Sequence, residues 1–373
     1  MLNSVKIAKN KPHYTSTRAW LDHLRLMAEL PYPSWALMPS IGEIVRAHID
    51  SAVMNFGWAD TNSLQPLATW VHPLKPNVYK RFLASPQDVF DDIPIKAMRD
   101  SRGRFLQMVE AMPNYEEAPI YQHMLKDYKA RWGLSTVIQT NQWLGFMTMY
   151  RQDDLGPYSE NDWKIMADAG LALSQLDQES SLANLPASEL HDVATSTMLL
   201  DSHGQIVAQS PEIHNLLFIS RQTGMGPPEW ARDDWFAMPP QVTALAQKLF
   251  DTTEPNGRAV ETQHLPWGRF DYILEKMQTQ ENQPKSIMTV TIRHHEPLDI
   301  TIARRLWGWP MSPQEKRIII ASARQASIEQ IAQILEISSG TLKNYSNELL
   351  ARFNLPSRNA LVKKILSGVH NFE

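Results

Sequence analysis

The hydrophobic pattern of residues 14–173 changes from helical to extended and back to helical. Trp20, Leu24 and Met27 recur on one side of a helix, whereas Trp143 to Tyr150 is an extended apolar run. The spacing predicts helices over 14–30, 41–50 and 157–173, and strands over 52–58, 67–72, 134–138 and 143–150. Residues 73–120 are interrupted by prolines and are expected to form helices and loops that cover a sheet. This order of elements is typical of an α+β sensory domain.

A second, smaller unit of mixed pattern follows the largely polar stretch 175–189. Two short apolar runs around the turn at 201–204 predict a hairpin. Ser210 and Pro211 predict the N-cap and first position of a helix that runs to Leu217. A further helix over 241–250 and a strand pair over 268–277 and 286–293 complete this second α+β unit.

From Met311 onward the pattern is helical throughout. Ser312, Ser327, Ser338 and Ser357 each precede an apolar stripe and predict the N-caps of four helices. The third predicted helix begins with small hydroxyl residues and presents polar side chains near its N-terminal end: Ser339, Thr341, Lys343, Asn344, Tyr345 and Asn347. Hydroxyl groups and helix N-termini bind phosphate, and Asn or Lys reaches base edges in the major groove. The pattern predicts a helix-turn-helix that binds DNA, although a solvated face of a small helical bundle has the same appearance.

Composition narrows the class of protein. The 373 residues include no Cys, which excludes disulfides, thiolate metal sites and Cys nucleophiles and fits a reducing compartment. No run approaches the roughly 18 apolar residues of a membrane span, and residues 1–6 lack the apolar core of a secretory signal, so no membrane association and a cytoplasmic location are expected. Twelve Trp and seventeen Met fit either ordinary cores or a roomy ligand pocket.

Charge is divided unevenly along the chain. Residues 308–373 hold eight Lys and Arg against five Glu, a net +3, whereas the other 307 residues carry −7. The excess of positive charge therefore lies where phosphates would be met.

Other chemistries lack the residues they require. Asp91-Asp92 has none of the surroundings of a phosphorylated receiver site, and there is no glycine-rich phosphate loop. His294-His295-Glu296 could hold a metal only if adjacent strand residues faced the same way, which they do not. Nothing specific indicates haem, and no Ser nucleophile elbow or interpretable carboxylate pair is present. No cofactor and no metal are expected.

Four motifs stand out between residues 311 and 366: Met311-Ser312-Pro313-x-Glu315, Ile331-Ala332, Ile337-Ser338-x-x-Thr341-Leu342-Lys343-Asn344 and Ser357-Arg358. In these motifs the segment resembles the C-terminal domain of LuxR-type (GerE-like) transcription regulators. The resemblance implies that the helix after Ser338 reads the major groove and that the last helix mediates dimerisation. The DNA-binding residues so implied are Ser327, Ser338, Ser339, Thr341, Lys343, Asn344, Tyr345, Asn347 and Arg358, and the dimerisation residues are Leu361, Val362 and Ile365.

Four positions depart from the usual pattern of that family. Gln325 and Asn354 stand where Gly is usual, Gln330 replaces Glu, and Tyr345 replaces His. Asn354 is expected to keep a left-handed helix end. Tyr345 leaves the detailed base contacts, and hence the operator sequence, open.

The two preceding units are similar to known sensory domains. Residues 143–150 with Tyr158-Ser159-x-x-Asp162 resemble a GAF domain, and residues 198–207 resemble a PAS domain. The expected organisation is a GAF-like domain over 1–183, a PAS-like domain over 184–305 and a helix-turn-helix domain over 306–373. The fold class is α+β and multidomain: two antiparallel-sheet sensory domains followed by a four-helix all-α domain.

A regulator of this organisation would respond to a signal. Trp and Met density on the predicted strands suggests a small apolar ligand bound by Trp58, Trp70, Met147 or Met149, and a role in the core or a dimer interface is equally open. The expected function is sequence-specific, dimeric DNA-binding transcription regulation, with promoter DNA and RNA polymerase as partners. The alternatives are control by partner proteins without a ligand, or an enzyme with a helical tail.

Overall fold

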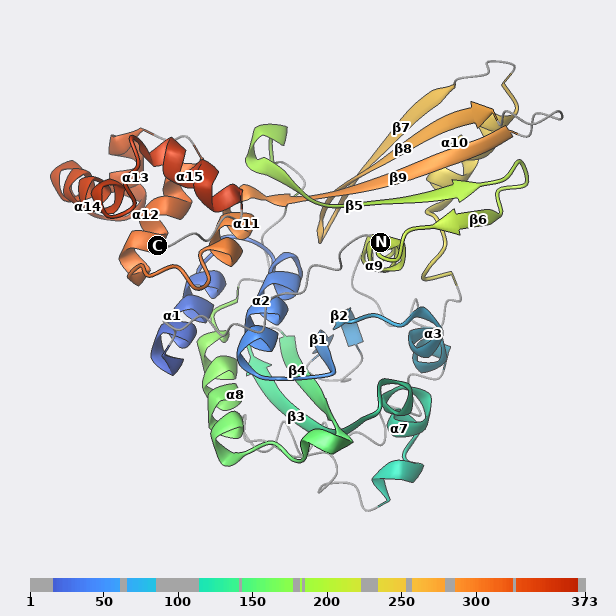
Figure 1. Cartoon of the computed structure of the whole chain (residues 1–373), viewed down its shortest axis with the longest axis horizontal. Coiled ribbons are helices and arrows are strands. Elements are labelled where there is room, and N and C mark those ends of the chain that lie inside the picture. Colours follow the sequence, from blue (N-terminus) through green and yellow to red (C-terminus); the bar gives the residue numbers. More distant parts are fainter. Residues whose placement is uncertain are drawn as a thin grey trace.

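The computed structural model describes residues 16–60, 66–84, 114–140, 143–176, 182, 185–222, 234–252, 257–278, 286–324 and 327–367. Within these ranges a four-stranded sheet, a five-stranded sheet and a group of C-terminal helices follow one another along the chain (Figure 1). None of the helices in these ranges is long and apolar enough to cross a membrane. Asp91-Asp92 and Gln325 lie outside the described residues.

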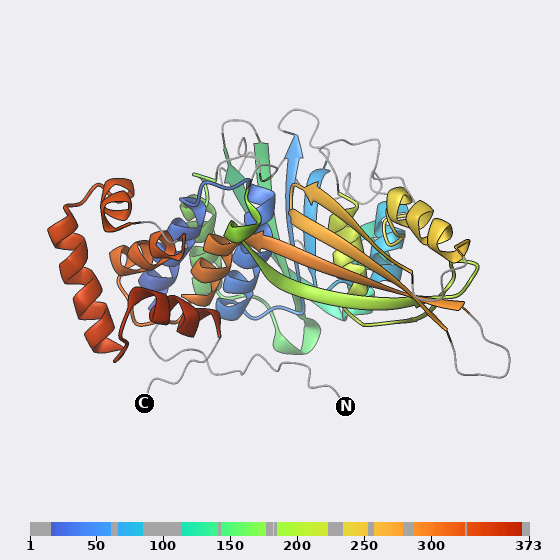
Figure 2. The ribbon, with the colours of Figure 1, turned by 90° about the horizontal axis from the view of Figure 1, so that it is seen from above.

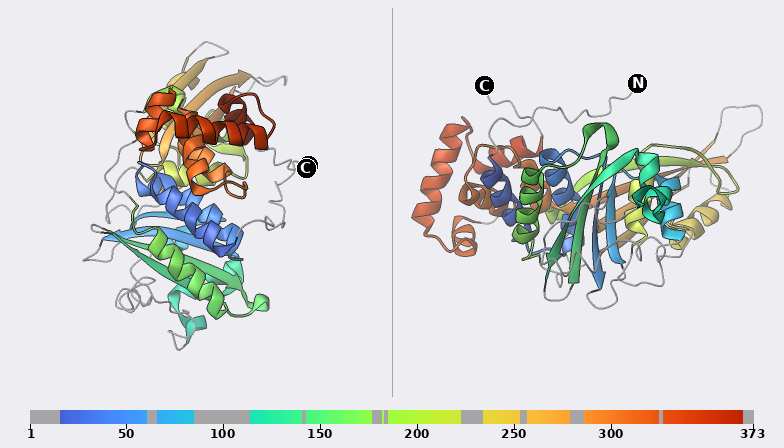
Figure 3. Two further views of the ribbon diagram at one scale, coloured as in Figure 1. Left: turned by 90° about the vertical axis from the view of Figure 1, so that its left-hand side faces the viewer. Right: turned by 90° about the horizontal axis from the view of Figure 1, so that it is seen from below.

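The first unit is an antiparallel sheet of order β2-β1-β4-β3 with helices packed on it. Its strands are β1 (Val53–Asp60), β2 (Pro66–His72), β3 (Ala130–Gln139) and β4 (Trp143–Gln152). The helices are α1 (Thr17–Ala28), α2 (Ser34–His48), α3 (Pro76–Ala84), α7 (Pro119–His123) and α8 (Glu160–Ala172), with short 3-10 helices η1 (Tyr115–Glu117), η2 (Leu125–Tyr128) and η3 (Asp153–Leu155). Helix α2 packs on β1 and β2, and α8 packs on β3 and α1 (Figure 3). The expected α+β unit is confirmed, and Ser159 is the N-cap of α8.

Two tryptophans in this unit lie directly over glycines. A Cβ atom at Gly42 would lie 2.2 Å from the Trp70 ring, and one at Gly145 would lie 2.6 Å from the Trp58 ring. Any larger residue would have to displace a buried indole, so these glycines serve the packing of helix on sheet and strand on strand.

The second unit is a five-stranded antiparallel sheet of order β6-β5-β9-β8-β7. The strands are β5 (Leu190–Leu200), β6 (Ile206–Gln209), β7 (Arg258–Leu265), β8 (Gly268–Gln278) and β9 (Ser286–Pro297). Helices α9 (Ile213–Ser220) and α10 (Pro240–Phe250) pack on it, and η4 (Ala187–Glu189) precedes β5. The sheet extends away from the C-terminal helices (Figure 2).

The predicted start of helix α9 is wrong. The helix begins at Ile213 after Glu212, not at Pro211. The Ser210 hydroxyl group accepts a hydrogen bond from the Thr197 amide at 2.9 Å and donates to the Thr197 carbonyl oxygen at 2.9 Å. Because β5 uses this hydroxyl group, Ser210 closes the hairpin instead of capping a helix.

Two elements of the second unit have no counterpart in the sequence-based prediction. Strand β7 alternates between exposed and half-buried residues, so it lacks the apolar run that marks a buried strand. Helix α11 (Leu298–Arg305) follows β9 directly and packs against α2, α12 and α15. This helix joins the second unit to both other parts of the chain.

His294 and His295 face different partners, as expected of neighbours on a strand. The His294 ring stacks on Phe270 and its Nε2 atom lies 2.8 Å from the Trp267 carbonyl oxygen. His295 pairs with Asp271 at 2.9 Å. The two imidazoles therefore serve separate structural contacts.

The C-terminal helices are α12 (Pro313–Ala323), α13 (Ile328–Ile334), α14 (Ser339–Arg352) and α15 (Arg358–Leu366). Their apolar side chains belong to two cores. One core is continuous from Trp20 in α1 to Ile365 in α15, and a small second core joins α12, α13 and α14. Helices α12 and α15 are therefore built into the body of the protein, whereas α13 and much of α14 project from it (Figure 2).

Candidate nucleic-acid interface

Each C-terminal helix begins where its serine predicts. The hydroxyl groups of Ser312, Ser327, Ser338 and Ser357 accept hydrogen bonds from backbone amides three residues later, at 3.0–3.2 Å. Ser312 with Glu315 and Ser327 with Gln330 form complete capping boxes. Gln330 thus performs the same capping that a glutamate would, which explains why this departure is tolerated.

Helices α13 and α14 are held together by the small second core. Ile331, Ala332 and Leu342 are buried in it with Ile318 and Ala321 of α12. Between the two helices Glu336 has a left-handed backbone with φ 53°, and the Ile337 amide donates to the Ala332 carbonyl oxygen at 3.0 Å. A left-handed glutamate gives no recognisable signal in the sequence, because Gly and Asn are the usual residues there.

The N-terminal half of α14 presents the polar face that the sequence predicts. Thr341, Lys343, Asn344 and Asn347 are exposed. The Thr341 hydroxyl group lies 2.8 Å from that of Ser338, which places two hydroxyl groups together at the start of the helix. Hydroxyl groups, backbone amides and an ammonium group at one helix end form a surface suited to phosphate and base edges.

Tyr345 and Arg358 are placed differently from the other expected contacts. The Tyr345 side chain is half-buried and packs against the small core of α12, α13 and α14. Arg358 donates to the Ser322 hydroxyl group at 3.5 Å and is also half-buried. Both side chains therefore contribute to the packing of α14 and α15, and only part of each is accessible to DNA.

Glu329 is a charged neighbour that the sequence did not indicate. Hydrogen bonds from its own backbone amide and from Ser327 hold the pKa of this exposed carboxyl below its usual range, and Lys343 lowers the pKa further. The carboxylate of Glu329 on α13 therefore interacts electrostatically with the lysine of α14, without forming an ion pair among the described contacts. It opposes the approach of a phosphate to Lys343.

Half of the positive charge in residues 308–373 is used inside the chain. Arg317, Arg324 and Arg352 pair with Glu29, Asp299 and Glu315, and Lys316 contacts His23. Among the described residues, Lys343, Arg358, Lys363 and Lys364 have no carboxylate partner. Few basic side chains of this segment are therefore available to bind phosphate. Of these, Lys343 is the one on the polar face of α14.

The sequence of residues 310–365 matches the family described as bacterial regulatory proteins, luxR family. The C-terminal segment is a LuxR-family helix-turn-helix domain. No curated protein matches the chain.

Solved structures of two proteins, SdiA and VqmA, show low similarity to the chain. SdiA in complex with octanoyl-rac-glycerol is 11% identical over 95% of this chain and 96% of its own, with a TM-score of 0.31. Escherichia coli SdiA in another crystal form is 12% identical over 89% of this chain and 92% of its own, with a TM-score of 0.24. The Vibrio cholerae VqmA dimer without target DNA is 13% identical over 46% of this chain and 82% of its own, with a TM-score of 0.20. TM-scores at this level do not establish a common arrangement of the whole chain.

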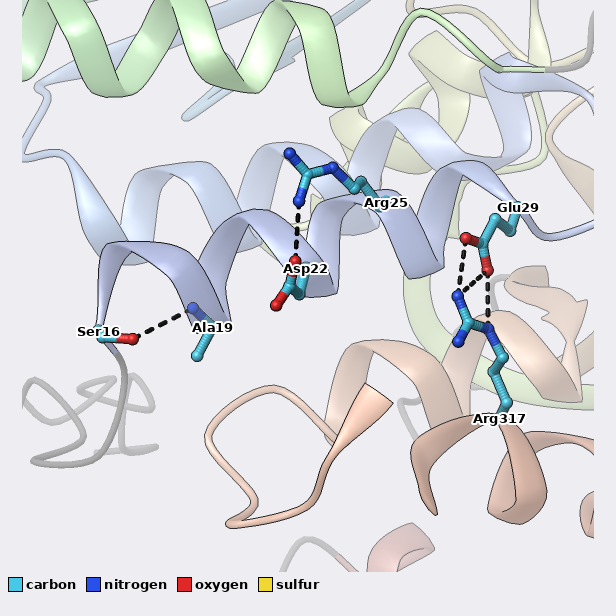
Figure 4. Close-up of polar contacts among 6 residues, drawn as sticks. All are labelled: Ser16, Ala19, Asp22, Arg25, Glu29 and Arg317. Atoms are coloured by element: carbon cyan, nitrogen blue, oxygen red, sulfur yellow. Dashed lines mark hydrogen bonds and ion pairs between the residues drawn. The ribbon is translucent and has the colours of Figure 1, made fainter. Parts of the chain in front are cut away.

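The LuxR-family domain is docked onto the first unit through α12. Arg317 makes a two-pronged ion pair with Glu29 at the end of α1, with N–O distances of 2.7–2.9 Å (Figure 4). Arg324, the C-cap of α12, donates to Asp299 of α11 and to the Tyr32 hydroxyl group. These contacts hold the middle of α12 against α1 and its C-terminal end against α11.

The residues expected to mediate dimerisation are buried within the chain. Leu361, Val362 and Ile365 of α15 are 0%, 8% and 1% exposed, and α15 packs on α11 and α12. In this structure they contribute to the main core. Lys363 and Asn359 lie on the exposed side of the same helix.

The four residues expected to contact a ligand are likewise part of the main core. Trp58, Met147 and Met149 are fully buried and Trp70 is 8% exposed. Packing of the two tryptophans over Gly145 and Gly42 leaves no space beside them on those sides. Their arrangement favours the structural role that the sequence left open.

Proposed function

We propose that the protein is a sequence-specific DNA-binding transcription regulator whose first two units control the α13–α14 pair. The first unit would be GAF-like and the second PAS-like, and both would act as sensory domains. The regulator would bind promoter DNA as a homodimer and act on RNA polymerase.

One observation carries this proposal: within a LuxR-family domain, the N-terminal face of α14 is exposed, while α12 and α15 are docked on the rest of the protein. Thr341, Lys343 and Asn344 are accessible, and the Thr341 amide at the start of the helix donates to the Ser338 hydroxyl group. Such a face is able to enter the major groove without displacing any part of the chain described here.

The homodimer is proposed because two-fold related half-sites are read by two copies of a helix-turn-helix. Since Leu361, Val362 and Ile365 are occupied by α11 and α12, contact through α15 would use its exposed side, which includes Asn359 and Lys363. SdiA and VqmA are each described with a small molecule, octanoyl-rac-glycerol and DPO, and a small-molecule signal is proposed for this chain as well.

Substitutions at Lys343, Thr341 and Glu329 should change DNA affinity in opposite directions. Lys343→Ala removes a phosphate-neutralising charge and should weaken binding to a selected duplex about tenfold, while reducing the salt slope by about one. Thr341→Ala should weaken binding by about 1 kcal/mol. Glu329→Gln removes the repelling carboxylate and should tighten binding. Fluorescence anisotropy with duplexes selected from a random pool, between 50 and 300 mM salt, measures all three.

Lys248→Ala is the matched control, because Lys248 is an exposed helical lysine in α10, far along the chain from α14. It should leave affinity and salt slope unchanged. If Lys343→Ala and Thr341→Ala bind DNA as tightly as the unaltered protein, the assignment of α14 as the reading helix is wrong.

A further inference from the structure

A cavity of about 280 Å³ lies between α1 and the segment that leads into α12. One wall is Ala19, Asp22, His23 and Leu26 of α1. The opposite wall is formed by residues 308–313 together with Lys316. Figure 4 shows Ala19 and Asp22 on α1, and at the end of this helix Glu29, which pairs with Arg317 of α12. The cavity therefore lies at the junction of the first unit and the LuxR-family domain.

Lys316 is a buried cation with too few partners. Its side chain belongs to a residue that is 6% exposed, and the Nζ atom lies 3.2 Å from Nδ1 of His23. Among the described residues His23 provides the one hydrogen-bond acceptor that Lys316 has. An ammonium group has three N–H donors, so two have no acceptor among the described residues and can face the cavity that Lys316 lines.

His23 is held as a neutral acceptor. Because the ammonium group can only donate, Nδ1 of His23 must accept, and the ring proton lies on Nε2. Burial lowers the pKa of His23 well below its usual value, and Lys316 lowers it further. A neutral histidine does not balance the charge of Lys316. Asp22 faces the same region, but its carboxylate is bound to Arg25 at 2.8 Å.

We propose that this cavity binds a small monocarboxylate, whose carboxylate group accepts the free hydrogen bonds of Lys316 and whose apolar body lies against Leu26, Trp309 and Met311. A charged acceptor satisfies a buried ammonium group more strongly than a neutral one does. The walls also include Ala19, Pro310 and Pro313, which have no polar side-chain atoms to bind a more polar ligand.

Size and charge exclude larger and more highly charged ligands. The volume is just below the roughly 300–1,000 Å³ of sites for drug-sized molecules, so the ligand is compact. A phosphate dianion would need further cations, whereas Asp22 is the only other charged side chain in the walls besides Lys316. A carboxylate with a single negative charge matches the single lysine.

Occupancy of the cavity would act on the contact between α1 and α12. A role of the carboxylate in controlling DNA binding rests on the proposed function, whereas the binding of the carboxylate to the cavity does not. Calorimetry on the protein without DNA therefore tests the site independently of DNA recognition.

Replacing the buried lysine should raise stability in the absence of ligand. Burial lowers the pKa of Lys316 from 10.5 to about 8, opposed by Asp22. Below pH 8 both native and unfolded chains hold the proton and the native chain carries the full cost of the buried charge. As pH rises from 8 toward 10.5, the native chain loses the proton first and the cost disappears. Lys316→Met should therefore raise the Tm by about 2–4 °C at pH 7, with a smaller gain at pH 9.5.

The titratable groups that face Lys316 are His23 and Asp22 of α1, since residues 308–313 contain none. A Lys316→Met protein that is less stable than the unaltered protein at pH 7 would show that Lys316 already has a stabilising partner.

The decisive experiment is isothermal titration calorimetry of the full chain with benzoate, phenylacetate and hexanoate, with benzamide as the neutral counterpart of benzoate. At least one carboxylate should bind saturably, and benzoate should bind about tenfold more tightly than benzamide. Lys316→Met should weaken carboxylate binding about tenfold or more, and Lys248→Met should leave it unchanged. Ala19→Phe fills the cavity and keeps the lysine, so it should abolish binding even if Lys316→Met perturbs the structure.

Three outcomes would overturn the proposal. They are no binding of any of the three carboxylates, equal affinity for benzoate and benzamide, or carboxylate affinity in both Lys316→Met and Ala19→Phe that equals that of the unaltered protein. If the unaltered protein binds benzoate but no selected DNA duplex, the proposed function is contradicted and the proposed carboxylate site still stands.

Discussion

Replacing Arg324 by methionine is expected to lower the free energy of unfolding by about 3 kcal/mol, because it leaves a buried carboxylate without its cation. Asp299 is 3% exposed, and its carboxylate accepts hydrogen bonds from Nε and Nη2 of Arg324 and from the Tyr32 hydroxyl group. After the substitution the Tyr32 contact, at 3.1 Å, would be the one hydrogen bond left to this carboxylate among the described residues. Urea unfolding followed by tryptophan fluorescence measures the loss.

Arg317→Met provides the comparison on the same helix. The Arg317–Glu29 pair is about one-third exposed on each side, so its loss should cost less than about 1 kcal/mol. The double change Arg324→Met with Asp299→Asn should recover part of the stability, because no buried charge is then left unpaired. A loss below 1 kcal/mol for Arg324→Met would mean that α12 docks on α11 without need of this ion pair.

The second large effect is expected at Trp58, whose change to alanine should lower the free energy of unfolding by about 3–5 kcal/mol. The indole is fully buried, lies 6.0 Å from the Phe56 ring and occupies the space beside Gly145. Its removal would leave a cavity in the middle of the first sheet. Chemical denaturation of the full chain measures the change, and the sensory-pocket alternative predicts weaker ligand binding with little loss of stability instead.

Trp58→Phe and Leu171→Ala separate packing from other causes. Trp58 Nε1 has no hydrogen-bond partner among the described residues, so phenylalanine loses volume but no hydrogen bond and should cost less than alanine. Leu171 is 71% exposed, and its change to alanine should stay within about 0.5 kcal/mol. Equal stability of Trp58→Ala and Leu171→Ala would contradict a core role for Trp58.

The separation into two cores has a consequence for control. Helices α12 and α15 share the main core with α1, α2 and α11, whereas α13 and the start of α14 depend on the small core. A change in how α12 lies on α1 would therefore move the α13–α14 pair as a unit. The Lys316 cavity lies at that contact, which links the proposed ligand to the proposed output.

The C-terminal domain was the most predictable part because its signals are local. Ser312, Ser327 and Ser338 cap helices within three residues of themselves, and Asn354 adopts the left-handed conformation with φ 50°. Such contacts form between residues that are neighbours in the chain, so they can be predicted from the sequence alone. The same local rule failed at Ser210, where the hydroxyl group binds a strand thirteen residues earlier.

The sequence by itself determined the LuxR-family character of residues 310–365, the four capped helices and the exposed polar face of Thr341, Lys343 and Asn344. Only the tertiary structure decided which charged side chains are left without an ion pair within the chain and which apolar side chains are left uncovered for contact with a partner. Arg317 and Arg324 pair with residues more than twenty positions away in sequence, Lys316 lies against His23, and Leu361, Val362 and Ile365 are covered by α11 and α12. Local pattern cannot specify such contacts, because they depend on which distant surfaces the packed sheets and helices bring together.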